Sequence, residues 1–142
     1  MDNNDDVALI YSNLACVYDK QGNHELAETY YNKALERSLA AATPKPEHIA
    51  IFLNNLSMLY GKQKRYSEAL EMLEKVIHKC EELQDAQSLV SQIYNNIGKF
   101  YHALNDDDKA IEYLSKALEI QQNIYPSLHA GFAVTYNNLA DA

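Results

Sequence analysis

The chain has 142 residues, of which 47% are hydrophobic and 23% charged, and its formal net charge is −8. This length is enough for one domain with a core of its own. The negative net charge argues against binding to nucleic acid, because such binding needs clustered Lys and Arg. No apolar run is long enough to span a membrane, and the opening MDNNDD is unlike a secretory signal. Cys16 and Cys80 stand in different repeats at different phases, which predicts free thiols in a reducing cytoplasm.

Helical segments follow one another along the whole chain, because apolar residues recur every three to four positions. The turns support this pattern: Gly22 suits a helix end, while Asn23 and Asp106 are placed to cap the helices that follow. The sequence predicts an all-α fold in which consecutive helices pair as antiparallel hairpins. The expected helices are 6–21, 24–41, 47–62, 66–83, 86–103, 107–124 and 128–142.

One phrase recurs four times: YSNLACVY from Tyr11, LNNLSMLY from Leu53, YNNIGKFY from Tyr94 and YNNLADA from Tyr136. The intervals between successive phrases are 42, 41 and 42 residues, measured between Asn13, Asn55, Asn96 and Asn138. A fixed period of this size predicts a solenoid, in which each repeat buries its apolar face against its neighbours. The expected repeats are 7–46, 47–87, 88–129 and a partial fourth, 130–142, all within one array spanning 1–142. Because the last unit lacks its second helix, we expect the chain to be a fragment of a longer protein.

The repeat resembles the tetratricopeptide repeat, whose pattern combines aromatic, Leu and small residues at set spacings. The matching positions are Tyr11, Leu14, Ala15, Tyr18, Ala27 and Tyr31, and then Tyr94, Ile97, Gly98, Tyr101, Ala110 and Leu114. The second repeat departs from the pattern at Leu53, Ser57 and Leu73, and each unit is roughly eight residues longer than the usual 34. This long form is similar to the repeats of kinesin light chains. The resemblance implies a right-handed superhelix of about three and a half units and seven helices.

The repeated Asn residues are the most informative polar feature, because Asn is a poor helix former and these four share one helical phase. They form a stripe beside the core face. In the family that the chain resembles, this stripe lines a concave groove, where its Asn side chains bond the backbone of an extended peptide. The alternative is that they join neighbouring helices or are only solvated. The candidate groove residues are Leu9, Ser12, Asn13, Ile51, Asn54, Asn55, Met58, Lys62, Asn95, Asn96, Lys99, His102 and Asn138.

This set of residues favours a protein or peptide partner with an apolar anchor and an acidic stretch. The N-terminal part of the stripe is apolar, whereas Lys62, Lys99 and His102 lie further along. Members of the family that bind chaperone tails clamp a terminal carboxylate with Lys and Asn. The matching positions here offer only Asn55, so the sequence argues against that specificity. The positions without the expected side chain are Ser12, Cys16, Gln92 and Asn96.

Catalytic and metal chemistry find little support. The five His residues lack the spacing of a helical metal site, and no nucleophile elbow or phosphate-binding Gly loop is present. We therefore expect no enzyme activity, no cofactor and no metal, and we assign most of the 11 Tyr residues to the core. Two other functions stay open. One is a scaffold that self-associates through the apolar last helix, and the other is an accessory sensor domain of a larger signalling protein.

Overall fold

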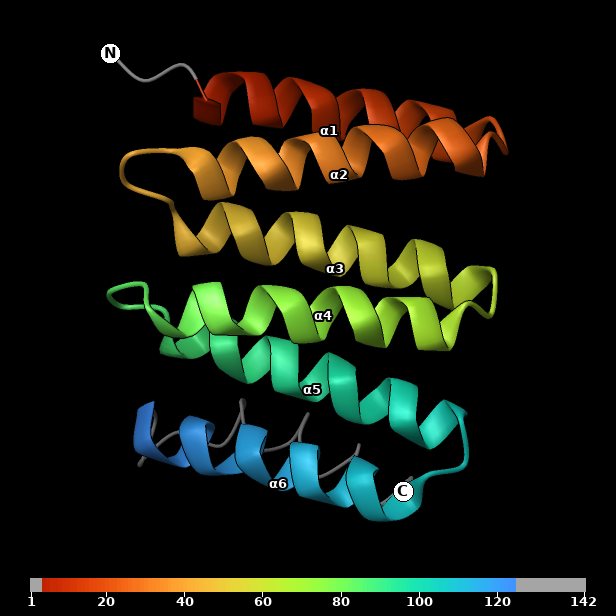
Figure 1. Cartoon of the computed structure of the whole chain (residues 1–142). Coiled ribbons are helices and arrows are strands. Elements are labelled where there is room, and N and C mark those ends of the chain that lie inside the picture. The colour runs from red at the N-terminus through yellow and green to blue at the C-terminus, as the bar shows by residue number, and fades with distance from the viewer. Residues whose placement is uncertain (1–3, 125–142) are drawn as a thin grey trace. The chain divides into compact units, whose positions relative to one another are not determined.

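The computed structural model describes residues 4–124, and within this range the chain is all helical (Figure 1). The order and type of the first six expected helices are confirmed, while the seventh, 128–142, lies outside the described residues. Contacts divide the chain into two compact units, Met1–Gln63 and Lys64–Ala142. The helices are α1 (Asn4–Lys20), α2 (His24–Ala40), α3 (Pro46–Lys62), α4 (Tyr66–Glu81), α5 (Gln87–Ala103) and α6 (Asp107–Ile124).

The first unit is built from α1, α2 and α3. Helices α1 and α2 form an antiparallel hairpin, and α3 packs against α2 (Figure 1). Helix α3 also contacts α1. Gly22 ends the first helix with φ 80°, and the N–H groups of Gly22 and Asn23 bond the carbonyls of Asp19 and Tyr18. Asn23 then accepts a hydrogen bond from the N–H of Leu26 at 3.2 Å. Both predicted turn residues thus perform their expected roles, because glycine adopts positive φ without a steric cost.

The second unit is built from α4, α5 and α6. Helices α5 and α6 form the hairpin, and α4 packs against α5. Asn105 occupies the place of Gly22, with φ 64°, and Asp106 caps α6 by accepting from the N–H of Lys109 at 3.3 Å. Helix α4 ends at Glu81, two residues earlier than expected, and the connection to α5 contains Asp85 with φ 54°. The cap residue of α4 is Glu82, whose backbone N–H bonds the carbonyl of Cys80.

Each unit has a core of large apolar side chains beside small residues. Three alanines that recur at the same position of α2, α4 and α6 are all completely buried: Ala27, Ala69 and Ala110. Gly98 on α5 faces Leu114 on α6 so closely that a Cβ atom would lie 2.7 Å from the Leu114 Cγ atom. Burying each large side chain contributes about 1.5–3 kcal/mol. The fully buried large residues include Ile49, Phe52, Leu53, Leu56 and Leu59 in the first unit, and Leu73, Ile93, Ile97 and Leu114 in the second.

The assignment of most tyrosines to the core was wrong. Of the nine tyrosines among residues 4–124, only Tyr31 and Tyr60 are buried, and the other seven are half-buried. A phenol presents a large apolar ring and a hydroxyl that needs a polar partner, so tyrosines favour the edge of a core. Helical spacing alone does not separate these two positions.

In the described range, 4–124, no helix combines the length and the apolar character needed to cross a lipid bilayer.

Candidate functional site

The first unit presents the predicted stripe on two neighbouring helices. Asn13 on α1 is exposed and Asn55 on α3 is partly exposed, and neither side chain has a hydrogen-bonding partner among residues 4–124. Ser12 is buried and therefore does not contribute to this surface, contrary to the prediction. We call the remaining residues the asparagine face of the first unit: Leu9, Asn13, Ile51, Asn54, Asn55 and Met58.

The second unit carries the same stripe on α5. Asn95 and Asn96 are partly exposed, and Lys99 is exposed one turn further on. His102 contacts Asp107 through its Nδ1 atom at 3.0 Å, which joins the end of α5 to the start of α6. We call Asn95, Asn96 and Lys99 the asparagine face of the second unit. Asn138 lies outside the described residues.

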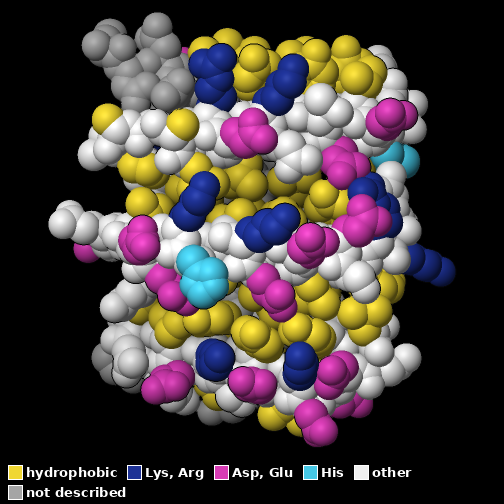
Figure 2. Space-filling model, in the orientation of Figure 1, with side chains coloured by type: hydrophobic (Ala, Val, Ile, Leu, Met, Phe, Trp, Pro, Cys, Tyr) yellow, Lys and Arg dark blue, Asp and Glu magenta, His cyan; other side chains and the backbone are white. Residues whose placement is uncertain are grey.

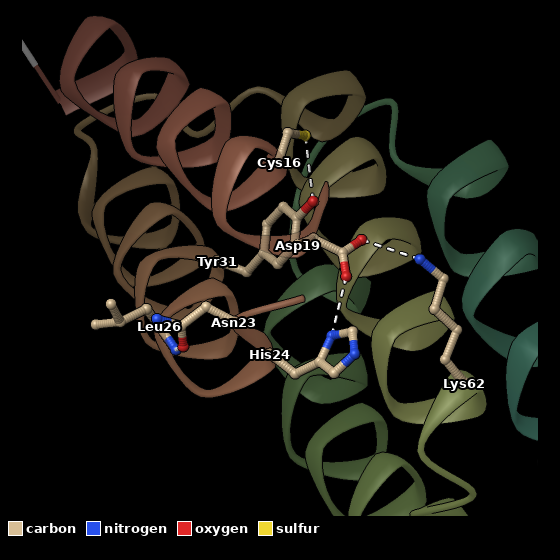
Figure 3. A network of polar contacts seen from close by, with 7 residues as sticks. All are labelled: Cys16, Asp19, Asn23, His24, Leu26, Tyr31 and Lys62. Atoms are coloured by element: carbon tan, nitrogen blue, oxygen red, sulfur yellow. Dashed lines mark hydrogen bonds and ion pairs between the residues drawn. The ribbon is translucent and has the colours of Figure 1, made fainter. Parts of the chain in front are cut away.

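Asp19 links the ends of three helices in the first unit. Its two carboxylate oxygens point toward His24 and Lys62, at 3.1 Å from His24 Nδ1 and 3.0 Å from Lys62 Nζ (Figure 3). The carboxylate is only 18% exposed, whereas the Lys62 side chain is 53% exposed. Lys62 was predicted to offer a positive charge to a ligand, but Asp19 neutralises that charge locally. The sequence could not reveal this pair, because its members are far apart along the chain.

The two cysteines are held as thiols. Cys16 Sγ lies 3.2 Å from the hydroxyl of Tyr31, which packs between α1 and α2 (Figure 3). Burial, and then the contact with Cys16, raises the pKa of Tyr31 above its ordinary value. Burial and the charge of Glu81 raise the pKa of Cys80 to about 11, so this thiol stays protonated at neutral pH and is a poor nucleophile or metal ligand. Residues 4–124 hold no cluster of His, Cys, Asp and Glu that could bind a metal ion.

Two tyrosine clusters were missed by the sequence analysis. In the first unit, the rings of Tyr11 and Tyr18 lie 5.8 and 5.6 Å from Tyr30, with Lys33 Nζ 5.2 Å from the centre of Tyr30. The second unit repeats this arrangement 83 residues later. The counterparts are Tyr94, Tyr101, Tyr113 and Lys116. The constant interval was the signal that could have identified both clusters.

The second cluster is tied to the preceding helix. The hydroxyls of Tyr94 and Tyr101 donate hydrogen bonds to Glu81 and Glu74 on α4, at 2.8 and 2.9 Å. Burial, followed by these bonds to carboxylates, raises the pKa of both tyrosines to about 12. The clusters therefore serve the packing of consecutive helices, with lysines covering the rings through cation–π contacts.

Comparison with known proteins agrees with the repeat pattern. Stress-induced-phosphoprotein 1 of Caenorhabditis elegans is 25% identical over 113 residues, which is 80% of this chain and 33% of that protein. Among solved structures, BtubC (BKLC) from P. vanneervenii matches with a TM-score of 0.74 and 28% identity, covering 91% of this chain and 51% of that one. The apo form of RapI matches with a TM-score of 0.76 and 21% identity, covering 95% and 47%, and this likeness shows the fold alone.

This chain spans about a third of the length of the curated relative named above. The resemblance to a kinesin light chain-like protein is confirmed by the likeness to BtubC. The family model described as Tetratricopeptide repeat matches residues 6–82 and 89–142. That match includes all four repeat phrases, and the chain belongs to the tetratricopeptide repeat family.

Proposed function

We propose that the chain binds an extended peptide segment of a protein partner across the asparagine faces of its repeats. Repeats of this family generally mediate protein–protein interaction. The observation that carries the proposal is that Asn13, Asn55 and Asn96 recur at one helical phase, reach solvent and have no hydrogen-bonding partner among residues 4–124. Each Asn costs a helix interior up to about 0.7 kcal/mol relative to Ala. An amide held ready for a ligand explains that repeated cost, because it pairs with both the N–H and the C=O of a peptide.

The proposal follows the right-handed superhelix that the family resemblance implies. Each asparagine face would contact a different stretch of one extended peptide, because the repeated Asn residues recur from repeat to repeat, and Asn138 of the partial fourth repeat would do the same. The family match over both units supports this continuity.

The side chains of the two asparagine faces indicate which kind of peptide would bind. Leu9, Ile51 and Met58 are exposed apolar side chains on the first unit, and they favour an apolar anchor in the ligand. Lys99 is exposed on the second unit and favours an acidic residue, whereas the charge of Lys62 is already neutralised by Asp19. We therefore expect the acidic stretch of the peptide to pair with Lys99 more than with Lys62.

The test uses peptides selected from a random library displayed against the full chain. A selected peptide is labelled and titrated with wild type, Asn55→Ala, Asn96→Ala and the control Asn123→Ala, which changes an exposed Asn on α6. We expect Asn55→Ala and Asn96→Ala each to weaken the binding free energy by about 1 kcal/mol. The control Asn123→Ala should leave the affinity unchanged. Folding should be unchanged or slightly improved, because Ala is the better helix former.

Charge reversal at Lys99 gives a second readout. Lys99→Glu should slow the association of acidic peptides, and the effect should fade as salt is added, because exposed charges act mainly through long-range attraction. Unchanged affinity in Asn55→Ala, Asn96→Ala and Lys99→Glu would place the binding site elsewhere and make the repeated Asn residues structural.

The other readings remain predictions. Self-association through 128–142 falls on residues that are not described, and the sensor-domain reading depends on sequence beyond this chain. Tetratricopeptide repeats are typically non-enzymatic interaction modules. The cytoplasmic location and the absence of a cofactor are likewise expectations for experiment.

A further inference from the structure

The first helix exposes a row of large apolar side chains. Ile10, Leu14 and Val17 on α1 are 59%, 38% and 53% exposed. These residues and the hydroxyl of Tyr18 form what we call the outer face of α1. Figure 2 shows apolar side chains gathered along the edge of the molecule formed by α1. Three large apolar residues on successive turns of one helix are more than the scattered exposure that is normal for a protein surface.

The other repeats bury the same face. On α3 the equivalent residues, Phe52, Leu56 and Leu59, are at most 1% exposed. The equivalent residues on α5 are buried as well: Ile93, Ile97 and Phe100. Helix α3 packs against α2, and α5 packs against α4, so within each unit a preceding helix lies against the corresponding helix. The chain thus contains two examples of what fits this face.

The covering helices also supply carboxylates to tyrosine hydroxyls. Tyr60 on α3 donates to Glu28 on α2 at 2.9 Å, and Tyr101 on α5 donates to Glu74 on α4 at 2.9 Å. Tyr18 occupies the same place in the first repeat, yet its hydroxyl forms no hydrogen bond with any residue in the range 4–124. The outer face of α1 therefore keeps both the apolar row and the hydrogen-bond donor of a helix interface.

We propose that the outer face of α1 docks an amphipathic helix of a partner protein, which presents an apolar stripe flanked by carboxylates seven residues apart. This is the pattern of α4, whose Leu70 and Ile77 are buried and whose Glu74 and Glu81 accept from tyrosines of α5. The surface is distinct from the asparagine faces, so the proposal does not depend on peptide binding there.

A partner protein fits this face better than a second copy of the chain. A second copy could present its α6 to this face. The positions of α6 that correspond to Glu74 and Glu81 of α4 are Ser115 and Gln122, so α6 has no carboxylate at either position. Helix α4 has the right pattern but is already packed on α5 of its own unit.

The probe is a synthetic peptide with the sequence of residues 66–82, carrying Cys80→Ser, titrated into the full chain and followed by NMR. We expect the chemical-shift changes to map to the outer face of α1. The double variant Ile10→Glu/Val17→Glu should weaken binding at least about tenfold, whereas the matched control Ile111→Glu, at a residue of α6 that is 47% exposed, should not. Because these positions are exposed, the variants should melt like wild type.

The tyrosine contact is tested by a double-mutant cycle. Tyr18→Phe should weaken binding of the peptide about fivefold, because the hydroxyl loses its carboxylate partner. The same change should leave unaltered the binding of a second peptide, in which both Glu74 and Glu81 are replaced by Gln. Absence of binding at millimolar peptide, binding unaffected by Ile10→Glu/Val17→Glu, or shift changes on α5 in place of α1 would each overturn the proposal. So would dimerisation of the peptide-free chain in sedimentation that Ile10→Glu/Val17→Glu abolishes, since the occupant would then be a second copy. Asn55→Ala should leave this binding unchanged, which separates it from the groove.

Discussion

The helices α1 and α5 carry the same repeat phrase but lie in different surroundings. Ile10 on α1 is 59% exposed, while the equivalent Ile93 on α5 is 1% exposed. The two helices have the same length, the same spacing of apolar residues and the same pair of tyrosines. The difference arises because α5 has α4 packed against it and α1 has no helix before it among residues 4–124. In a solenoid, the burial of a residue thus depends on its neighbour in the stack rather than on its own helix.

The largest difference in stability between the two helices should appear when Ile93 and Ile10 are each replaced by Ala. Ile93→Ala should destabilise the protein by about 2–4 kcal/mol, because it removes buried methyl groups and leaves a cavity. Ile10→Ala removes the same atoms from an exposed site and should change stability by less than about 0.5 kcal/mol. Urea unfolding of both variants, followed by circular dichroism, provides the measurement. Equal losses would show that the outer face of α1 is buried in solution.

The small residue between paired helices gives a second contrast. Ala15 in the first repeat corresponds to Gly98 in the third, where a Cβ atom would lie 2.7 and 2.8 Å from two carbons of Leu114. Gly98→Ala should cost about 1–2 kcal/mol net, because overpacking outweighs the gain in helix propensity.

Thermal melting measures this cost, and the effect should shrink when Leu114 is shortened to Ala in the same chain. The reverse change in the first repeat, Ala15→Gly, should also destabilise, since α1 loses a packed methyl group and gains a flexible residue. A stabilised Gly98→Ala protein would mean that Leu114 moves aside freely.

The smallest expected difference in stability between α1 and α5 comes from removing a tyrosine hydroxyl. Tyr101→Phe removes a bond to Glu74 and should cost about 0.5–1 kcal/mol at neutral pH, whereas Tyr18→Phe should cost almost nothing. The pKa values of Tyr94 and Tyr101, raised from 10.0 to about 12, give this contrast a pH dependence. Both tyrosines hold their protons more tightly in the folded state. Their contribution to the free energy of unfolding is therefore complete below pH 10 and is lost as the pH rises toward 12.

Absorbance titration of the phenols in wild type and Tyr101→Phe, together with stability measured across the same pH range, checks this expectation. The difference between the two titrations gives the pKa of Tyr101. An ordinary pKa for Tyr101 would mean that its bond to Glu74 on α4 is absent in solution.

Much of the fold follows from local pattern in the sequence. The helices, the left-handed turn at Gly22 and the caps Asn23 and Asp106 all depend on residues within a few positions of one another, and the structure confirms them. Three features of the candidate site did not follow. Ser12 is buried, Lys62 pairs with Asp19, and most tyrosines lie at the edge of the core. Each depends on a helix that is distant in sequence.

By itself, the sequence establishes that this chain is a series of helices whose apolar pattern repeats. Backbone hydrogen bonding, capping and the period of apolar residues are short-range, so they are already visible along the chain. The tertiary structure alone decides that Ile93 is buried and Ile10 exposed, and that Tyr101 has a carboxylate partner while Tyr18 has none. The physical reason is that burial and ion pairing are set by side chains from other helices, and similar phrases lie beside different neighbours.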